Sequence, residues 1–463
     1  MSQEKKPNIV LVVMDTARAQ NFSCYGHDRK TSPFLDSLAE NNVKYENAFV
    51  QENWTLTSHA SMFSGNYVSD HQITESMSFE DVDSFTSELE DRGYSTYGFS
   101  NVAFLTAEYD FDTLFDYFEY NRGEDFFSGI ETTREGFRDG SGVGRYLNLI
   151  GDIASSRRFD KVFTGLDNFL SEKLFLKDSG AKETNRKVRN ILKDQEDPFF
   201  LFLNYTEPHT PYIPPFPYSH KFLDNKARAG ELREIAYRSK DRYLGTDEDP
   251  DEEFVQTLRN LYDGEINYLD TKLEELHDYI SERFPDTVFI FTSDHGEYIG
   301  EHGFFDHGIG SFKEVKHVPL IEKFPDGQNE EIEKPVEIKH LCDHILKLSE
   351  GDLKPIQGKK IAFSEDIGSK DNDKTKFFYE ERGYYGVSAF TENHFFEWYS
   401  SGKTVLRDME TGEEMRDEEK ETRLRNEISD RFGSPENNSV IENEEIDPED
   451  EKIKSELEKL GYL

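Results

Sequence analysis

Cysteine is scarce in this chain of 463 residues. It has two cysteines, Cys24 and Cys342, which lie far apart in the sequence. Two distant thiols cannot build a disulfide framework, and neither belongs to a cysteine and histidine cluster with zinc-finger spacing. The composition therefore argues against a disulfide-stabilised scaffold and against a structural zinc module.

Long apolar runs are also missing. The N-terminus reads "MSQEKKPNIVLVVMD", and its apolar run is too short for the core of a signal peptide. No stretch reaches the roughly 18 apolar residues that a membrane-spanning helix needs. We therefore expect a cytoplasmic protein with no integral membrane segment, with export by a partner or by an unusual route as the alternative.

Positive charge is in short supply. The chain has 54 Lys and Arg against 95 Asp and Glu, a formal net charge of −41 that is spread along its length. Such a surface repels nucleic acid and anionic membranes, so we expect no nucleic-acid partner. Dense carboxylates keep a protein hydrated where salt screens their repulsion, which indicates a halophile, although an acidic, solvated surface alone is the simpler alternative.

What the chain does have is the pattern of an α/β protein. Aromatic residues make up 14% of it, so Phe and Tyr supply much of the core. Three short, nearly continuous apolar segments read as buried parallel strands, at 8–13, 199–205 and 287–293. Helical patterns lie around them, at 32–43, 255–284 and 336–351. The alternation predicts a largely parallel central sheet flanked by helices.

The character of the sequence changes near residue 350. Short antiparallel strands with turn signals follow, which predicts a small α+β subdomain over 351–425. Residues 426–463 read as a charged helical tail, and within the first domain, 1–350, residues 225–254 read as a surface insertion.

Each predicted strand leads to a residue that can bind metal or move protons. The first ends at Asp15, the second runs into "NYTEPHTPY" with His209, and the third ends at Asp294 and His295. Ligands of open α/β sheets bind outside the carboxyl ends of the strands, so these side chains are predicted to meet at one edge. Any one of them alone could be a loop-capping Asp or a surface His.

Asp15, Asp294 and His295 supply two carboxylates and an imidazole, a set that suits Mn, or Zn, better than an all-oxygen Ca site. We expect one divalent metal ion, Mn first, with Zn, Mg and Ca as alternatives. The stretch "NWTLTSHASMFSG" places Thr55 just ahead of a helix that we expect from Ser58 onward. Thr55 is then either a helix cap or a hydroxyl ligand of the metal that acts as a nucleophile.

These motifs resemble the sulfatase branch of the alkaline-phosphatase superfamily. The matching stretches are "PNIVLVVMDTARAQNFSCYG", "NWTLTSHASMFSG", "RGYSTYGFSN", "NYTEPHTPY", "FTSDHGEYIGEHGFFDHG" and "HVPLI". The resemblance covers about residues 7 to 350, with a sulfatase-like subdomain behind it. It implies an alkaline-phosphatase-like core, hydrolysis of a sulfate or phosphate ester through a covalent intermediate, and a small anionic substrate such as a sulfated or phosphorylated glycan or lipid headgroup.

The chain departs from the sulfatase pattern at the nucleophile. Thr55 stands where sulfatases carry the Cys or Ser that becomes formylglycine, and oxidation of a Thr hydroxyl gives a ketone instead of an aldehyde. A sulfated Thr cannot release its sulfate by forming an aldehyde. A phosphorylated Thr can be hydrolysed, or its phosphoryl group can be transferred, by in-line attack. The departure favours phosphodiester or phosphonate chemistry, or group transfer, over sulfate.

Other departures concern the charged residues. Thr16 replaces the second acid of the sulfatase Asp-Asp pair, Ser100 and Asn101 stand where one lysine is expected, and the late lysine falls near His307. No second-metal motif of the two-zinc relatives is visible, hence the expectation of one metal.

The resemblance also gives roles to the remaining candidates. His209 and His307 are expected to contact the transferred group and protonate the leaving oxygen, with loop histidines as the alternative. His59, Asn101 and Arg18 are expected to contact substrate. The alternative for His59 is a solvent-facing helix His, and the alternative for Arg18 is a surface ion pair. The competing function is a catalytically silent protein of the same fold that binds an anion or a sugar.

Overall fold

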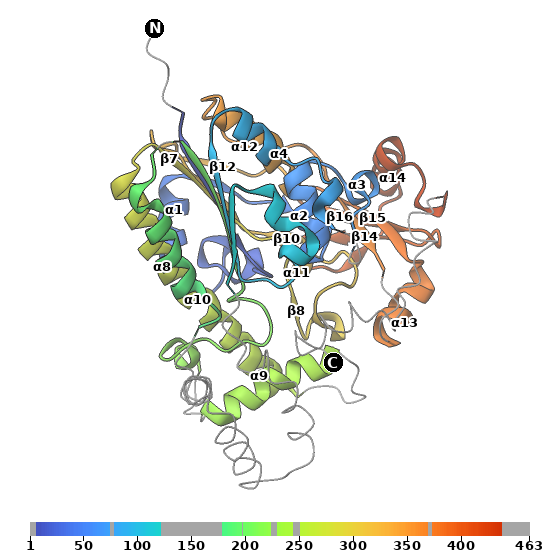
Figure 1. Ribbon diagram of the computed structural model, residues 1–463. Coiled ribbons are helices and arrows are strands. Elements are labelled where there is room, and N and C mark those ends of the chain that lie inside the picture. The colour runs from blue at the N-terminus through green and yellow to red at the C-terminus, as the bar shows by residue number, and fades with distance from the viewer. Residues whose placement is uncertain are drawn as a thin grey trace, which may run out of the picture.

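The computed structural model describes residues 6–74, 78–121, 178–196, 198–223, 229–243, 251–368 and 373–437. Its centre is an eight-stranded sheet in the order β12-β2-β11-β7-β1-β6-β4-β5 (Figure 1). The strands are β12 (Glu330–Ile332), β2 (Val43–Tyr45), β11 (Leu320–Lys323), β7 (Thr287–Thr292), β1 (Asn8–Met14), β6 (Phe199–Tyr205), β4 (Ser95–Ser100) and β5 (Tyr117–Tyr120). All neighbours pair in parallel except β11, which runs antiparallel to β7 and β2.

The three predicted strands are the centre of this sheet, because β1 pairs with both β6 and β7. Their near-continuous apolar sequences follow from burial on both faces. In β1, Val10 and Val12 face one core cluster, and Ile9 and Leu11 face the other.

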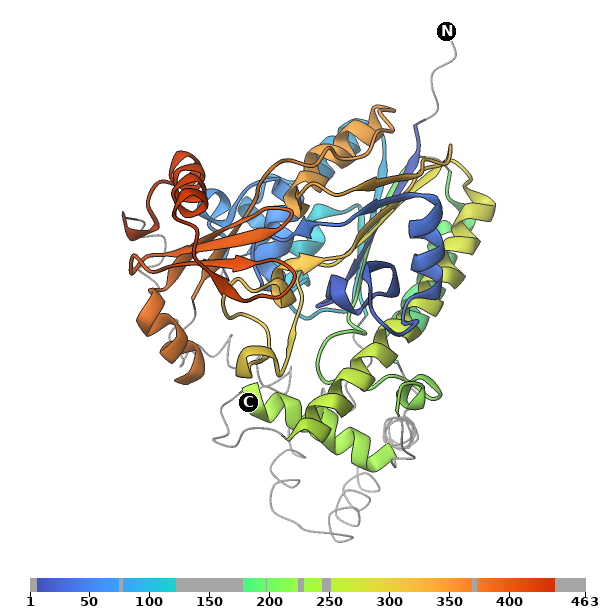
Figure 2. The ribbon, with the colours of Figure 1, turned by 180° about the vertical axis from the view of Figure 1, so that it is seen from behind.

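Helices cover both faces of the sheet (Figures 1 and 2). The helices on one face are α1 (Pro33–Asn41), α8 (Ala181–Ile191) and α10 (Glu252–Arg283). Those on the other are α2 (Thr55–Ser64), α4 (Phe85–Asp91) and α12 (Leu341–Ser349). Two short elements lie nearby, α3 (Val68–His71) and α11 (Lys313–Lys316), and α9 (Ala229–Tyr243) packs against α10. Most predicted helices are found within a few residues, but the segment predicted as one helix from 336 starts with strand β13 (Val336–Glu337), and its α-helix begins at Leu341.

The C-terminal part forms a separate antiparallel sheet. Its five strands are β14 (Ala362–Ile367), β15 (Tyr385–Phe390), β16 (His394–Tyr399), β17 (Thr404–Asp408) and β18 (Glu414–Met415). Helix α14 (Glu418–Phe432) packs on it through Leu424 and Ile428, and α13 (Asp373–Arg382) lies beside it (Figure 2). The predicted architecture, a largely parallel central sheet flanked by helices with short antiparallel strands behind it, is confirmed.

Two smaller sheets complete the described structure. One joins β10 (His317–Val318), β3 (Ala48–Phe49) and β13, and the other pairs β8 (Tyr298–Ile299) with β9 (Phe305–Asp306). Of the predicted insertion at 225–254, α9 and the start of α10 are described, and 225–228 and 244–250 lie outside the described residues. The predicted tail is described only to residue 437. The domain boundaries stay a prediction.

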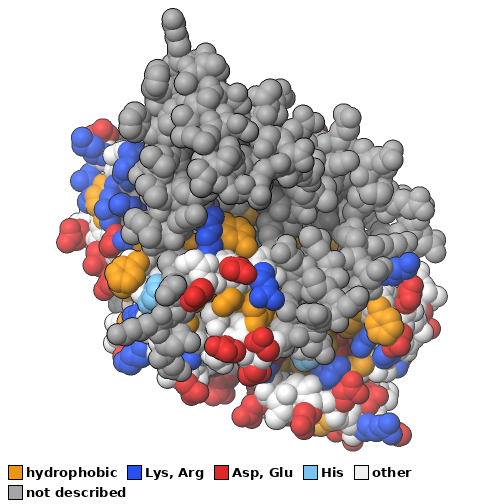
Figure 3. All heavy atoms as spheres, turned by 90° about the horizontal axis from the view of Figure 1, so that it is seen from below, with side chains coloured by type: hydrophobic (Ala, Val, Ile, Leu, Met, Phe, Trp, Pro, Cys, Tyr) orange, Lys and Arg blue, Asp and Glu red, His pale blue; other side chains and the backbone are white. Residues whose placement is uncertain are grey.

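The described surface carries charges of both signs on the face in Figure 3, where acidic and basic side chains are interspersed. In the part of the chain that the structure describes, no helix combines the length and the apolar character that crossing a bilayer requires.

Candidate active site

The site is built where β1 and β7 end side by side. These strands pair in parallel with Val13 opposite Thr292, so Asp15 and Asp294 both follow at the same edge. Ser293 links the two chain segments: its Oγ donates to the Met14 carbonyl at 2.5 Å and accepts the Ala17 N–H at 3.0 Å. The sequence thus fixes two carboxylates at adjacent strand ends, as the strand pattern predicted.

Asp15, Asp294 and His295 each offer a ligand atom, and these atoms lie within 4.8 Å of one another. All three side chains are fully buried. Both carboxylate oxygens of Asp15 and Oδ2 of Asp294 have no hydrogen-bond partner among the described residues. Buried carboxylate oxygens without partners are costly, and a divalent cation satisfies them. The donor set therefore fits the metal that the sequence predicted.

The electrostatics of these groups also suit a cation. Burial raises the pKa of Asp15 well above its ordinary value, and the neighbouring charge of Asp294 raises it further. Burial acts in the same direction on Asp294, but His295, His59 and the N–H groups of Thr16 and His295 hold the pKa of Asp294 below its usual range. Burial lowers the pKa of His295 to about 3, so its imidazole is neutral and keeps a lone pair.

Thr55 is the first residue of α2, so the helix begins three residues earlier than the sequence predicted. Its Oγ1 lies 3.3 Å from Nε2 of His295. His295 Nδ1–H donates to the Gly296 carbonyl, which leaves the lone pair of Nε2 facing Thr55. Ser58 Oγ donates to the Asp294 carbonyl at 2.6 Å and anchors α2 to the end of β7. The four predicted metal-site residues are brought together.

A second group of side chains adjoins the first. His209, Glu297, Asp306 and His307 also offer ligand atoms within 4.8 Å of one another. The ring centroids of His307 and His295 are 4.4 Å apart, and those of His307 and His209 are 5.4 Å apart. His209 and His307 therefore lie at the site, as predicted.

Glu297 and Asp306 were not among the predicted residues. Both lie in the stretch "SDHGEYIGEHGFFDHG", three and twelve positions after Asp294. The signal available in the sequence was this density of acids and histidines; the turn formed by β8 and β9 is what brings the two carboxylates back to the strand end.

The three predicted substrate contacts have protein partners instead. His59 is fully buried; its Nδ1–H donates to the Thr55 carbonyl at 2.8 Å, and its Nε2 accepts from Asn204 at 3.0 Å. Asn101 is bonded to Ser179 and Thr184. These contacts leave His59 no ring nitrogen for a ligand.

Arg18 is 2% exposed, and its guanidinium donates to the Glu297 carbonyl and to Glu301, both at 3.1 Å. It also stacks over the ring of Tyr262. These contacts hold the chain segment that carries Glu297, and none of them points the guanidinium at Asp15 or Asp294.

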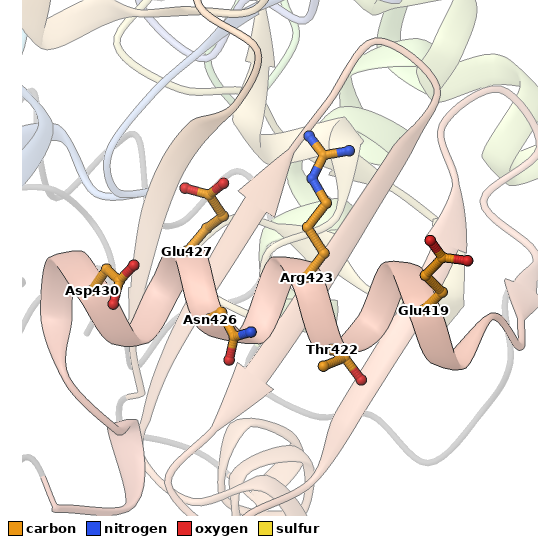
Figure 4. A pocket seen from close by; sticks show the side chains of 6 residues that line it. All are labelled: Glu419, Thr422, Arg423, Asn426, Glu427 and Asp430. Carbon is orange, nitrogen blue, oxygen red and sulfur yellow. The ribbon is translucent and has the colours of Figure 1, made fainter.

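A surface hollow of about 500 Å³ lies elsewhere, along α14 (Figure 4). Its lining side chains all come from this helix: Glu419, Thr422, Arg423, Asn426, Glu427 and Asp430. It contains no residue of either cluster.

Comparison with known proteins fits this geometry. The family model described as Sulfatase matches residues 7–351. The chain belongs to the sulfatase family. It is 22% identical over 366 residues to the uncharacterized sulfatase YidJ of Escherichia coli, an alignment covering 75% of this chain and 68% of that protein. It is 23% identical over 334 residues to an arylsulfatase of Clostridium perfringens, covering 66% of each chain.

Two solved structures resemble this chain over most of its length. Phosphonate monoester hydrolase of Agrobacterium radiobacter has a TM-score of 0.64 at 20% identity, covering 88% of this chain and 90% of that one. BT4656, solved in complex with its substrate D-glucosamine-2-N,6-O-disulfate, has a TM-score of 0.66 at 15% identity, covering 95% and 100%. At these identities the likeness establishes the fold.

Proposed function

We propose that this protein is a metal-dependent ester hydrolase that attacks sulfur or phosphorus through Thr55, with a covalent intermediate. The observation that carries the proposal is the position of Thr55 Oγ1, 3.3 Å from His295 Nε2 in the cluster with Asp15 and Asp294. Membership of the sulfatase family supports ester hydrolysis.

A divalent cation held by Asp15, Asp294 and His295 would supply Lewis-acid stabilisation and lower the pKa of the Thr55 hydroxyl. Thr55 sits at the N-terminus of α2, where backbone N–H groups and the helix dipole favour an anionic group. The Thr55 oxygen forms a bond to the central atom as the ester oxygen leaves. Water then attacks that atom, and the Thr55 oxygen is released.

We further propose that phosphodiesters and phosphonates are preferred over sulfate esters. Water can cleave a phosphate ester of threonine by in-line attack. A formylglycine hydrate instead expels sulfate by re-forming its aldehyde, and the secondary alcohol of threonine has no such route. We propose His209 and His307 as the groups that face the leaving oxygen, because both rings lie beside the Thr55 cluster. The substrate class is a small anionic ester, such as a phosphorylated or sulfated glycan or lipid headgroup.

Hydrolysis assays test this function. Aryl sulfate, bis-aryl phosphate and aryl phosphonate are offered in high salt with added Mn, to the wild type, Thr55→Ala and Thr57→Ala. Thr57 is the matched control, because its hydroxyl only donates to the Trp54 carbonyl in the same helix turn. We expect Thr55→Ala to lower kcat/KM by at least about a thousandfold and Thr57→Ala to leave it nearly unchanged.

Mass spectrometry of a quenched reaction should show the adduct on the peptide that contains Thr55. Activity on sulfate alone would overturn the proposed preference. Full activity in Thr55→Ala would overturn the nucleophile. Activity on none of the three esters would favour the anion-binding alternative. Added alcohols that capture the transferred group would identify a transferase.

A further inference from the structure

The cluster of His209, Glu297, Asp306 and His307 has no assigned role as a unit. Glu297 is fully buried, and Asp306 and His307 are 6% and 5% exposed. Each carboxylate has one oxygen held by the protein: Tyr212 OH donates to Oε2 of Glu297, and the His307 N–H donates to Oδ1 of Asp306 at 3.0 Å.

The other oxygen of each carboxylate, Glu297 Oε1 and Asp306 Oδ2, has no hydrogen-bond partner among the described residues. Glu297 Oε1 lies 3.8 Å from His307 Nδ1, and Asp306 Oδ1 lies 2.6 Å from the same nitrogen. One proton on Nδ1 cannot serve both carboxylates, so the cluster retains buried acceptors that need a positive partner.

His209 offers a nitrogen of the right kind. Its Nδ1–H donates to the Thr210 carbonyl at 2.6 Å, so the lone pair of the neutral ring is on Nε2. The four donors, two imidazoles and two carboxylates, form a set that zinc and manganese accept. Ligand atoms about 2.1 Å from one ion are at most about 4.2 Å apart, and a group within 4.8 Å closes on an ion with small side-chain rotations.

The charge of the whole site points the same way. Asp15, Asp294, Glu297 and Asp306 put four carboxylates into one buried region, and within the described ranges their ion-pair partners are all histidines. One divalent cation offsets two of these charges. The remaining negative charge would repel an anionic ester, because Coulomb interactions are strong in a buried site.

We propose that His209, Glu297, Asp306 and His307 bind a second divalent cation next to the first. The site is then dinuclear, which replaces the single metal that the sequence predicted. Two cations balance the four carboxylates and make the site attractive to an anionic ester. With the second ion bound, His209 and His307 act as its ligands, and the ion takes over their task of offsetting charge on the leaving oxygen. This role rests on the proposed function, whereas the binding of the ion does not.

Metal content of the full chain tests the proposal. The protein is stripped with a chelator, reloaded with zinc or manganese, and its metal-to-protein ratio is measured by plasma mass spectrometry. We expect two ions per chain in the wild type, and one in Glu297→Gln and in Asp306→Asn. Gln at position 297 still has an oxygen to accept from Tyr212, so the fold is retained. Asp15→Asn should also retain one ion, at the second site.

Glu265→Gln is the matched control. Glu265 is a buried carboxyl whose Oε1 accepts the Ile213 N–H and whose Oε2 has no described partner, yet it belongs to neither cluster. It should still bind two ions. Circular dichroism confirms that each variant is folded.

Anomalous scattering from wild-type crystals at the metal absorption edge locates the ions without any variant. Density at both clusters supports the proposal, and density at the Asp15 cluster alone overturns it. If the protein binds one ion and its hydrolysis depends on Thr55, the proposed function stands and the proposed second site is wrong. If the protein binds two ions but hydrolyses none of the esters, the second site stands and the proposed function is wrong.

Discussion

The Nδ1–H of His59 donates to the carbonyl oxygen of Thr55 at 2.8 Å, one turn earlier in the same helix. On its other side, Nε2 of His59 accepts from Asn204 at the end of β6. The imidazole therefore ties the helix that carries Thr55 to the central sheet. It does so from a fully buried position, with both nitrogens satisfied.

Replacing His59 with Phe should destabilise the protein without weakening substrate binding. The change leaves the Asn204 amide without its acceptor, which costs about 1–3 kcal/mol of unfolding free energy. Thr55 would lose its tie to the sheet, so kcat should fall while KM stays nearly constant. Urea unfolding and steady-state kinetics measure the two effects. A large rise in KM with unchanged stability would instead restore His59 as a substrate contact.

Asp15→Asn should have opposite effects on stability with and without metal. Asp15 and Asp294 are buried carboxylates that repel each other. Removing one charge should therefore raise the unfolding free energy of the metal-free protein by about 1–3 kcal/mol. In the presence of Mn the same change removes a ligand and lowers the melting temperature relative to the wild type. Thermal unfolding in chelator and in Mn tests this reversal. Asp15→Asn being less stable than the wild type under both conditions would contradict it.

His71 should make stability depend on pH. Burial lowers its pKa from the ordinary 6.5 to about 4. The Ile73 N–H donates to Nδ1, and Nε2–H donates to Ser61, so the folded protein holds the neutral ring. Below pH 6.5 the unfolded chain binds a proton that the folded chain refuses, so stability is lost as the pH falls from about 6.5 to about 4.

His71→Gln should flatten the stability profile in that pH window, which urea titrations at successive pH values would show. Gln can still accept from Ile73 or donate to Ser61 but does not titrate. Equal slopes in the wild type and His71→Gln would assign the effect to other groups.

Salt should stabilise the protein, which is our test of the proposed halophilic origin. A net charge of −41 repels itself in the compact state, and raising the salt from about 0.1 M to about 3 M screens this repulsion. We expect the melting temperature to rise over that range with sodium and potassium chloride. A melting temperature independent of salt would leave the acidity as an ordinary solvated surface.

The sequence by itself determined the architecture and half of the site. Three short, nearly continuous apolar runs predicted central parallel strands, and parallel strands place Asp15, Asp294 and His295 at one edge. Thr55 was predicted from its position just ahead of an expected helix and from its match to the sulfatase nucleophile position, and the helix itself starts at Thr55, three residues before the predicted start. These features depend on short-range pattern, which the sequence states directly.

Only the tertiary structure decided the rest. Whether His59, Asn101 and Arg18 face a ligand or the protein depends on partners 83 to 279 positions away, such as Asn204, Thr184 and Glu297. Asp306 lies near Glu297 because β9 pairs with β8 directly after it, and the segment after β6 brings His209 to both. Such contacts arise from packing between distant segments, and the local pattern of a sequence carries no record of which polar atoms that packing leaves unpaired.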